Sequence, residues 1–218
     1  MVISTSKQLE ELPKQIETSG QYLADRCSEG IFPCDVLALT VLGRSFNLLQ
    51  GFKILADSEN YTSAAGLLRF QLDNLLRLYG VISSGNPHET AHLLITGTKL
   101  PHIKDQYGKK LRDSYLVELF EVKNSWVRQA YEMLSGYVHL SDQHFQRFLQ
   151  QSVVLPDGSR NFTISDTDTH IATEDREKLV QFFINITDGI NLLVKEWVNS
   201  REQFESVASL KGKYQIVV

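Results

Sequence analysis

A set of polar residues in the segment 128–139 has the side-chain types needed for acid–base chemistry. If this segment is helical, four of them project onto one face, because residues three and four apart lie above one another on a helix. A guanidinium binds phosphate, and histidine is the side chain whose charge changes nearest neutral pH. We therefore predict a site in which an arginine binds a phosphate-bearing substrate while a histidine transfers a proton. The four residues are Arg128, Glu132, Ser135 and His139.

Ser135 lies one turn before His139, so its hydroxyl can orient the imidazole or bind a ligand. A Ser–His nucleophile pair is conceivable, although the sequence contains no nucleophile elbow and no evident oxyanion hole. The structural alternative is that Ser135 and His139 satisfy each other at a helix interface while Arg128 pairs with Glu132. The sequence leaves both interpretations open.

A second charged stripe interrupts an otherwise apolar segment. Arg69, Asp73 and Arg77 are four residues apart and therefore share one helix face. Burying such charges for stability alone gains little, because desolvation can cancel the Coulomb attraction. We therefore expect Arg69 and Asp73 to face another polar group, with Ser135 and His139 as the hypothesised partners.

Residues 88–92 match the zinc-peptidase pattern H-E-x-x-H. In such a peptidase His88 and His92 would bind the metal on one helix face, and Glu89 would activate water. Pro87 immediately precedes the first histidine, whereas the peptidase motif normally lies inside a longer helix.

Glu89 also has a structural role available to it, because Asn86 and Glu89 have the spacing of a capping box. No third ligand is linked to the motif, although Glu118 and Glu121 lie at a distance that some such peptidases use. We predict a capped surface helix and no cofactor, and keep a metal-dependent hydrolase at His88 and His92 as the alternative.

The elements that position these residues are predicted to be helices. Hydrophobic periodicity indicates an all-α bundle of six or seven helices, forming one domain over residues 1–218. Two β-branched runs around 156–159 predict a small β-hairpin, inserted at about 152–165 before the long C-terminal helix, and 206–218 is expected to be a tail. The helices are expected to begin near Thr5 (with a restart at Pro13), Pro33, Tyr61, Pro87, Lys109, Asn124 and Thr173, with Ser141 either inside a helix or starting a further one.

Composition narrows the class of protein. Hydrophobic residues make up 42% and charged residues 22% of 218, which is typical of a globular protein. The net charge of −4 gives no global basic footprint for nucleic acid. Polar side chains interrupt the most apolar stretch, 36–55, which predicts a buried helix and not a membrane span. Two cysteines, Cys27 and Cys34, and a start without a signal-peptide pattern favour a cytoplasmic protein with reduced thiols.

The runs SAAGLLRFQLDNLLRL (63–78) and YEMLSGYVHLS (131–141) resemble a group of bacterial helical proteins with a Y-x-x-L-S-x-x-x-H motif. That group is distantly similar to the HEPN superfamily, whose helical bundles commonly dimerise and include RNA-cleaving toxins and anti-phage proteins. The resemblance covers about residues 35–195. It implies a homodimer and RNA or a nucleotide as ligand. The residues that carry it are Arg69, Asp73, Tyr131, Ser135 and His139.

The sequence departs from the HEPN pattern in the spacing of arginine and histidine. Catalytic HEPN proteins have an Arg and a His four to six residues apart, whereas ten residues separate Arg128 from His139. Either Arg69 supplies the positive charge from another helix, or no RNA cleavage occurs.

Three hypotheses follow. The first is a HEPN-like ribonuclease of a stress or defence system, in which Arg69, Ser135 and His139 are catalytic and Asp73, Arg128 and Tyr131 bind the substrate. The second is a non-catalytic bundle that binds a nucleotide, a small ligand or a protein partner in the same pocket. The third is the metal-dependent hydrolase.

Overall fold

The computed structural model describes residues 2–139 and 141–214, and the side chains of all of these except 2–6, 143 and 147. The all-α class and the hairpin before the long C-terminal helix are confirmed, but the described residues form nine α-helices, more than the six or seven predicted. The elements are α1 (Val2–Arg26), α2 (Pro33–Asp57), α3 (Tyr61–Ile82), α4 (Pro87–Ile95), a 3₁₀ turn η1 (Leu100–His102), α5 (Asp113–Glu121), α6 (Trp126–Val138), α7 (Asp142–Gln150), β1 (Val153–Val154), β2 (Arg160–Asn161), α8 (Thr173–Phe204) and α9 (Val207–Lys213).

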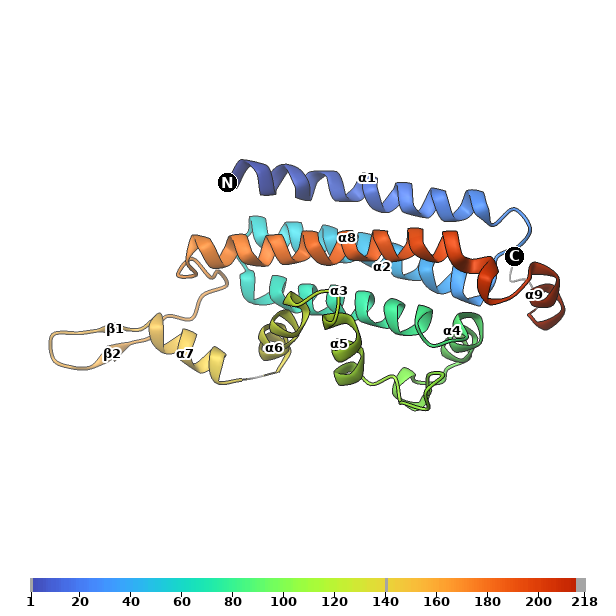
Figure 1. The fold of residues 1–218 in the computed structure, drawn as a ribbon. Coiled ribbons are helices and arrows are strands. Elements are labelled where there is room, and N and C mark those ends of the chain that lie inside the picture. Colours follow the sequence, from blue (N-terminus) through green and yellow to red (C-terminus); the bar gives the residue numbers. More distant parts are fainter. Residues whose placement is uncertain (1, 140, 215–218) are drawn as a thin grey trace.

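Four long helices, α1, α2, α3 and α8, lie side by side and form the body of the molecule (Figure 1). Helix α8 packs against α1 and α3, while α2 packs against α1, α3 and α4. Their buried faces meet in one apolar core, in which the rings of Phe52 and Phe183 stack with centroids 4.5 Å apart. Helices α5 and α6 pack on α3 and on each other, so α3 is the element between the core and the outer pair of helices.

Short sequence signals, a proline or a capping side chain, determine where most of the helices begin. Pro33 opens α2, and the Asn60 side chain accepts a hydrogen bond from the Ser63 N–H at 3.1 Å at the start of α3. The start of α1 was predicted wrongly. This helix begins at Val2 instead of Thr5 and runs through Pro13 without a restart. One backbone hydrogen bond is lost at a proline, but the apolar side chains on both sides of Pro13 are buried against the core and hold the helix together.

Helix α5 begins later than predicted, at Asp113 instead of Lys109. The preceding residues form a tight turn around Asp105, whose carboxylate accepts hydrogen bonds from the N–H groups of Tyr107 and Lys109 at 2.9 Å. Its other oxygen accepts from the Tyr115 hydroxyl at 2.6 Å. A short acidic side chain that accepts hydrogen bonds from nearby backbone N–H groups stabilises a turn at the expense of a helix. Residues 105–109 therefore form a turn, and α5 begins only after it.

The segment after α6 projects from the body as an arm, defined here as residues 142–164, which contains α7 and the hairpin (Figure 1). The strands pair in antiparallel register, Val153 with Asn161 and Val154 with Arg160, and Gly158 in the turn has φ 84°. The arm exposes an unusual number of large apolar side chains. These are Phe145, Phe148, Leu149, Val153, Val154, Leu155, Phe162 and Ile164.

A buried carboxylate joins α2 to α8. Asp35 is fully buried, and its two oxygens accept three hydrogen bonds. The Trp197 indole N–H donates at 2.9 Å, the Arg201 guanidinium at 2.6 Å and the Phe32 N–H at 3.0 Å. These three donors satisfy both carboxylate oxygens of Asp35 inside the core.

The same guanidinium also holds the loop between α1 and α2. Arg201 donates to the carbonyl oxygens of Arg26 at 2.8 Å and Gly30 at 3.2 Å. Leu210 and Tyr214, within the segment 206–218 that was expected to be a tail, pack with Phe32 through helix α9. The rest of that tail, residues 215–218, lies outside the described residues.

Both cysteines are free and buried near this carboxylate. Burial raises the pKa of the Cys27 thiol to about 11, with a further contribution from Asp35. Burial likewise raises the pKa of Cys34 well above its ordinary value. The stretch 36–55 lies within α2, as predicted, and among the residues described, no helix is both long and apolar enough to cross a membrane.

Replacement of Arg201 with alanine should destabilise the fold strongly. The variant leaves Asp35 buried without its cationic partner, and breaking a buried pair in this way costs about 3–5 kcal/mol. Urea denaturation followed by circular dichroism measures the loss. The matched control is Lys178→Ala, which removes the exposed ion pair with Asp175 and should leave the midpoint nearly unchanged. Similar midpoints for the two variants would contradict the role given to Arg201.

Candidate functional site

The structure brings five of the six predicted site residues to one cavity, of about 320 Å³, between α2, α3, α6 and the start of α5. We call it the α3–α6 cavity. Helix α3 supplies residues one turn apart, and α6 supplies residues near its C-terminal end. The predicted residues that line it are Arg69, Asp73, Tyr131, Ser135 and His139, and the further ones are Arg44, Phe70, Asp113 and Val138.

Arg69 is held in the cavity wall by an aromatic ring and a carboxylate. Its guanidinium lies 4.6 Å from the centre of the Tyr131 ring, and its Nη2 lies 3.5 Å from Oδ2 of Asp113. Only 13% of its side chain is exposed. Cation–π contact and the ion pair therefore fix its orientation. Arg69 pairs with Asp113 from α5, and not with Asp73 on its own helix.

Asp73 is paired with two other arginines. Nε of Arg77 donates to both carboxylate oxygens at 2.7 Å, and Nη1 of Arg44 lies 3.7 Å from Oδ2. Burial disfavours the charged form of Arg77, but the hydrogen bonds and charge of Asp73 outweigh this effect and the pKa of Arg77 is raised. Arginines and carboxylates thus alternate along this wall. The three arginines, Arg44, Arg69 and Arg77, outnumber the two carboxylates, Asp73 and Asp113, so one positive charge is not balanced.

Arg44 is a cavity residue that the sequence interpretation missed. Its Nη1 donates to Oδ1 of Asn74 at 2.6 Å, and the Asn74 amide in turn donates to Gln71 Oε1 at 3.1 Å and Ser45 Oγ at 3.4 Å. Gln71 then donates to Thr187 of α8 at 3.0 Å. This buried chain of amides and hydroxyls ties one cavity arginine to α8. Gln71 and Asn74 were the available signal, since buried amides in an apolar helix require partners.

His139 lies at the cavity but not on the predicted helix. Helix α6 ends at Val138, and His139 has extended backbone angles (φ −107°, ψ 145°) as its C-terminal cap. Ser141 donates back to the carbonyl of Gly136 at 2.9 Å, which fixes the reversal of the chain before α7. The His139 side chain is exposed, and no hydrogen bond joins its ring to any other described residue. The imidazole is therefore accessible to a ligand.

Ser135 and His139 do not satisfy each other, and no Ser–His nucleophile pair is formed. The Ser135 hydroxyl donates to the carbonyl of Tyr131 at 2.7 Å, four residues earlier on the same helix. This is the common bond of a serine inside a helix, and it uses the hydroxyl proton. The Ser135 oxygen can still accept a hydrogen bond from a ligand.

Arg128 is the predicted site residue that the fold places elsewhere. Its Nε lies 2.5 Å from Oε2 of Glu121 at the end of α5, so the alternative pairing with Glu132 is not formed. Because α5 packs against α6, Arg128 reaches a carboxylate on the neighbouring helix. It does not line the α3–α6 cavity, so the structure does not bring it together with His139 as a phosphate ligand.

The H-E-x-x-H segment starts a capped helix as predicted, with Asn86 accepting from the Glu89 N–H at 3.3 Å. His88, however, is not at the surface, since only 1% of it is exposed. Its Nδ1 accepts from the Cys34 N–H at 3.4 Å, and its ring meets that of Trp197 edge-on at 5.0 Å. His88 therefore belongs to the core between α2, α4 and α8.

The other two motif residues contact the C-terminal helix region. The Glu89 carboxylate accepts from the Tyr214 hydroxyl at 2.9 Å, and the His92 ring lies 5.1 Å from the Tyr214 ring. The side chain of Glu89 thus binds Tyr214. Within residues 2–139 and 141–214 no group of three or more His, Cys, Asp or Glu side chains is arranged to hold a metal ion. The motif packs α4 against its neighbours.

The stability of the protein should fall at acidic pH through His88. Burial lowers the pKa of His88, Arg201 and Lys213 lower it further, and Asp35 and Glu205 offset this in part. The unfolded chain binds a proton at this histidine near pH 6.5, before the folded state does. The free energy of unfolding is therefore at its full value above that pH and decreases as the pH falls below it.

Urea denaturation at pH 7.5 and 5.5 tests this pH dependence. In His88→Leu the difference in unfolding free energy between the two pH values should shrink relative to the wild type. In the control His102→Ala, which removes an exposed histidine, the difference should stay the same. An equal pH dependence in wild type and His88→Leu would show that His88 is not responsible.

Comparison with protein-family models, with curated proteins and with solved structures found no match to this chain. The similarity to the HEPN superfamily therefore rests on the residues of the two motif segments and stays a prediction. What the protein does has to be argued from the α3–α6 cavity itself.

Proposed function

We propose that this protein acts on RNA by binding a backbone phosphate in the α3–α6 cavity. Arg44 and Arg69 are the phosphate ligands, and His139 is the general acid or base. The observation that carries the proposal is the convergence, in one cavity of about 320 Å³, of two guanidinium groups from different helices and an accessible imidazole.

The arginines are suited to bind an anion because they are fixed in place but not saturated. A guanidinium has five N–H donors, and Arg69 makes one ion pair, at 3.5 Å, along with its contact to the Tyr131 ring. Its low exposure strengthens electrostatic attraction relative to a residue in water. An incoming phosphate accepts two parallel hydrogen bonds from such a group, and it competes with the loosely held Asp113.

An aromatic ring beside the arginines favours a nucleic acid over inorganic phosphate. Phe70 lines the same cavity, is 43% exposed, and lies under the Arg44 guanidinium at 5.8 Å from its ring centre. Bases of single-stranded RNA stack on exposed aromatic side chains. A nucleotide bound here would place its phosphate at the arginines and its base on Phe70.

Cleavage would follow the ordinary chemistry of RNA. The ribose 2′-oxygen attacks phosphorus, the P–O2′ bond forms, and the P–O5′ bond breaks. His139 either takes the proton of the 2′-hydroxyl or gives one to the leaving 5′-oxygen, and water exchanges the other proton. The arginines stabilise the negative charge that develops on the phosphate oxygens.

A specific observation favours the second candidate function, binding without cleavage. Both cavity carboxylates are paired with arginines, and the Ser135 proton is donated to a backbone carbonyl. Among the described cavity side chains, the His139 imidazole and the Tyr131 hydroxyl are the acid–base groups with no hydrogen bond to another side chain. A non-catalytic protein that binds RNA or a nucleotide needs nothing more than the two arginines and Phe70.

The first experiment measures binding and cleavage of a labelled single-stranded RNA by the pure protein, by fluorescence anisotropy and on gels, with and without EDTA. Arg69→Ala should weaken binding by about tenfold or more, because a hydrogen-bonded charge is lost. His139→Ala should retain binding and lose cleavage, and EDTA should change neither. Arg160→Ala in the hairpin and His102→Ala are the matched controls, and both should behave as wild type.

The outcomes separate the hypotheses once circular dichroism shows that each variant folds. Binding lost in Arg69→Ala without cleavage by any form would establish the non-catalytic alternative. Cleavage abolished by EDTA and unaffected by His139→Ala would support metal-dependent hydrolysis instead. Absence of both binding and cleavage in the wild type would refute the proposal for RNA.

We also propose that the protein pairs with a second copy through the arm. Eight large apolar side chains of the arm are between 40% and 93% exposed. Exposed apolar side chains concentrated in one segment are typical of a surface that pairs with another protein. The two short strands have unpaired edges as well, and a second copy offers the same strand edges and the same apolar side chains.

Sedimentation at micromolar concentration tests the pairing. The wild type should have the mass of a dimer, and Phe145→Glu/Ile164→Glu should be monomeric because it puts charges into the apolar patch. Both side chains are largely exposed, so the fold of the monomer should survive. Ile54→Glu is the control, since it charges an exposed isoleucine on α2. A monomeric wild type, or a double variant that remains dimeric, would exclude this interface.

A further inference from the structure

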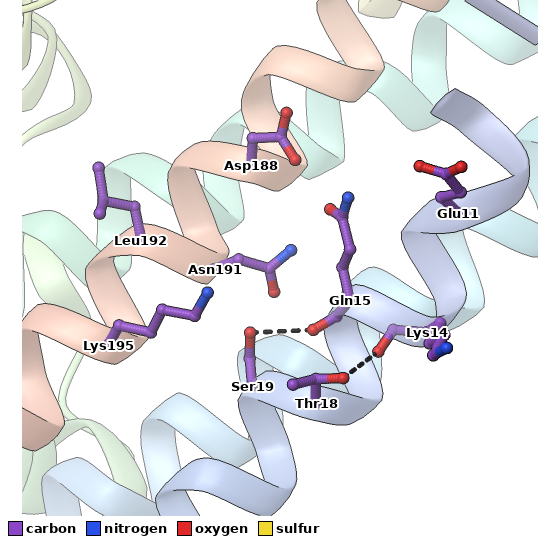
Figure 2. A pocket seen from close by; sticks show the side chains of 9 residues that line it. All are labelled: Glu11, Lys14, Gln15, Thr18, Ser19, Asp188, Asn191, Leu192 and Lys195. Atoms are coloured by element: carbon purple, nitrogen blue, oxygen red, sulfur yellow. Dashed lines mark hydrogen bonds between the residues drawn. The ribbon is translucent and has the colours of Figure 1, made fainter. Parts of the chain in front are cut away.

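A second and larger cavity, of about 600 Å³, lies between the two long helices α1 and α8 (Figure 2). We call it the α1–α8 groove. It shares no lining residue with the α3–α6 cavity, and neither the sequence motifs nor the proposed function uses it. The lining residues are mostly polar, and four are charged. They are Glu11, Lys14, Gln15, Thr18 and Ser19 of α1 and Asp188, Asn191, Leu192 and Lys195 of α8.

Asn191 is the unusual residue of this groove. Only 6% of it is exposed, yet neither Oδ1 nor Nδ2 has a hydrogen-bond partner among the described residues. In Figure 2 its amide lies between the two helices, facing α1. Buried amides are almost always paired, because an unpaired donor and acceptor lose their hydrogen bonds to water without compensation. An unpaired amide in the wall of a cavity therefore indicates a missing partner.

The neighbouring hydroxyls do not provide that partner. Ser19 donates to the carbonyl of Gln15 at 3.0 Å, and Thr18 donates to the carbonyl of Lys14 at 2.7 Å. Both bonds lie within α1, so the hydroxyl protons are used by their own helix. What remains at Asn191 is one donor and one acceptor side by side, which is complementary to another carboxamide.

The charges around Asn191 are balanced and unpaired. Glu11 and Lys14 lie on α1, and Asp188 and Lys195 lie one turn before and one turn after Asn191 on α8. None of the four forms an ion pair with another described residue. Two carboxylates and two ammonium groups favour neither an anion nor a cation, but they suit a ligand that carries both charges.

The carboxylate of Asp188 lacks a close counter-charge. Partial burial against the groove raises its pKa, and Lys195 offsets this only in part. A ligand ammonium placed beside Asp188 would supply the missing positive charge, and a ligand carboxylate would meet the amines of Lys14 and Lys195. The Asn191 amide and the four charged groups of the groove then each have a complementary group on one small molecule.

We propose that the α1–α8 groove binds a small zwitterion that carries a carboxamide, of which glutamine is the simplest representative. The ligand amide would donate to Oδ1 of Asn191 and accept from Nδ2, while its ammonium faces Glu11 and Asp188 and its carboxylate faces the two lysines. The proposal does not depend on RNA binding, because the two cavities have no residue in common.

The test is a titration of the full-length protein with L-glutamine up to millimolar concentration, followed by the amide chemical shifts of isotope-labelled protein. Shifts should be confined to residues of α1 and α8. L-Glutamate has the same size, but it replaces the amide donor with a charged acceptor, and L-norleucine lacks the carboxamide. Both should bind at least about tenfold more weakly, since a site built to pair an amide rejects analogues without it.

Variants separate a binding role of Asn191 from a structural one. Asn191→Leu should lose glutamine binding, and it should raise the urea midpoint of the ligand-free protein, because an unpaired buried amide is removed. Asp188→Ala and Lys195→Ala change exposed side chains, so they should fold normally and bind glutamine more weakly. Asn47→Leu, at an exposed position on α2, is the matched control and should bind as wild type.

Three results would overturn the proposal. The first is the absence of glutamine-induced shifts in α1 and α8 at millimolar concentration. The second is equal affinity for glutamine and glutamate. The third is unchanged glutamine binding by both Asp188→Ala and Lys195→Ala, which keeps the test decisive even if Asn191→Leu fails to fold.

Discussion

The buried carboxylate of Asp35 is the constraint on which the arrangement of the helices depends. It fixes where α8 lies along its axis relative to α2, because Trp197 and Arg201 both donate to it. Thr187 lies four turns before Arg201 on the same rigid helix, about 21 Å away, and there it meets Gln71 of α3. The hydrogen bonds that continue from Gln71 through Asn74 end at the Arg44 guanidinium. The position of a cavity arginine is thus linked, through the middle of α8, to the contact at the C-terminal end of that helix.

The sequence predicted the structure correctly where a structural feature depends only on residues next to one another in the chain. The cap at Asn86, the proline that opens α2 and the hairpin turn at 156–159 are local signals, and each was predicted correctly. The membership of Arg69 and His139 in one cavity was also predictable, because charged residues on an apolar helix must face something polar. The helix end at Val138 was not, since a chain reversal closed by Ser141 leaves little trace in periodicity.

Hydrogen-bond and ion-pair partners that are far apart in the chain could not be predicted from the sequence. Arg201 and Asp35 are 166 residues apart, and nothing near either residue identifies the other. Arg128 was predicted to bind a phosphate beside His139 or, as the alternative, to pair with Glu132 on its own helix, whereas helix packing brings it to Glu121 of α5. The same limit applies to Asn191, whose significance lies in having no partner, and this becomes visible only when α1 is in place. Periodicity reveals which face of a helix is buried, and only the fold reveals what that face meets.

The order in which the chain is synthesised gives the Asp35 contact a kinetic consequence. At a translation rate of about 5–20 residues per second, Asp35 leaves the ribosome roughly 10–30 s before Arg201 does. During that interval α1, α2 and α3 exist without α8, which contacts all three of them in the finished protein. The early helices then expose apolar faces and a carboxylate without its counter-ion. Completion of the native fold must therefore wait for the last part of the chain, and the early helices stay exposed to aggregation until then.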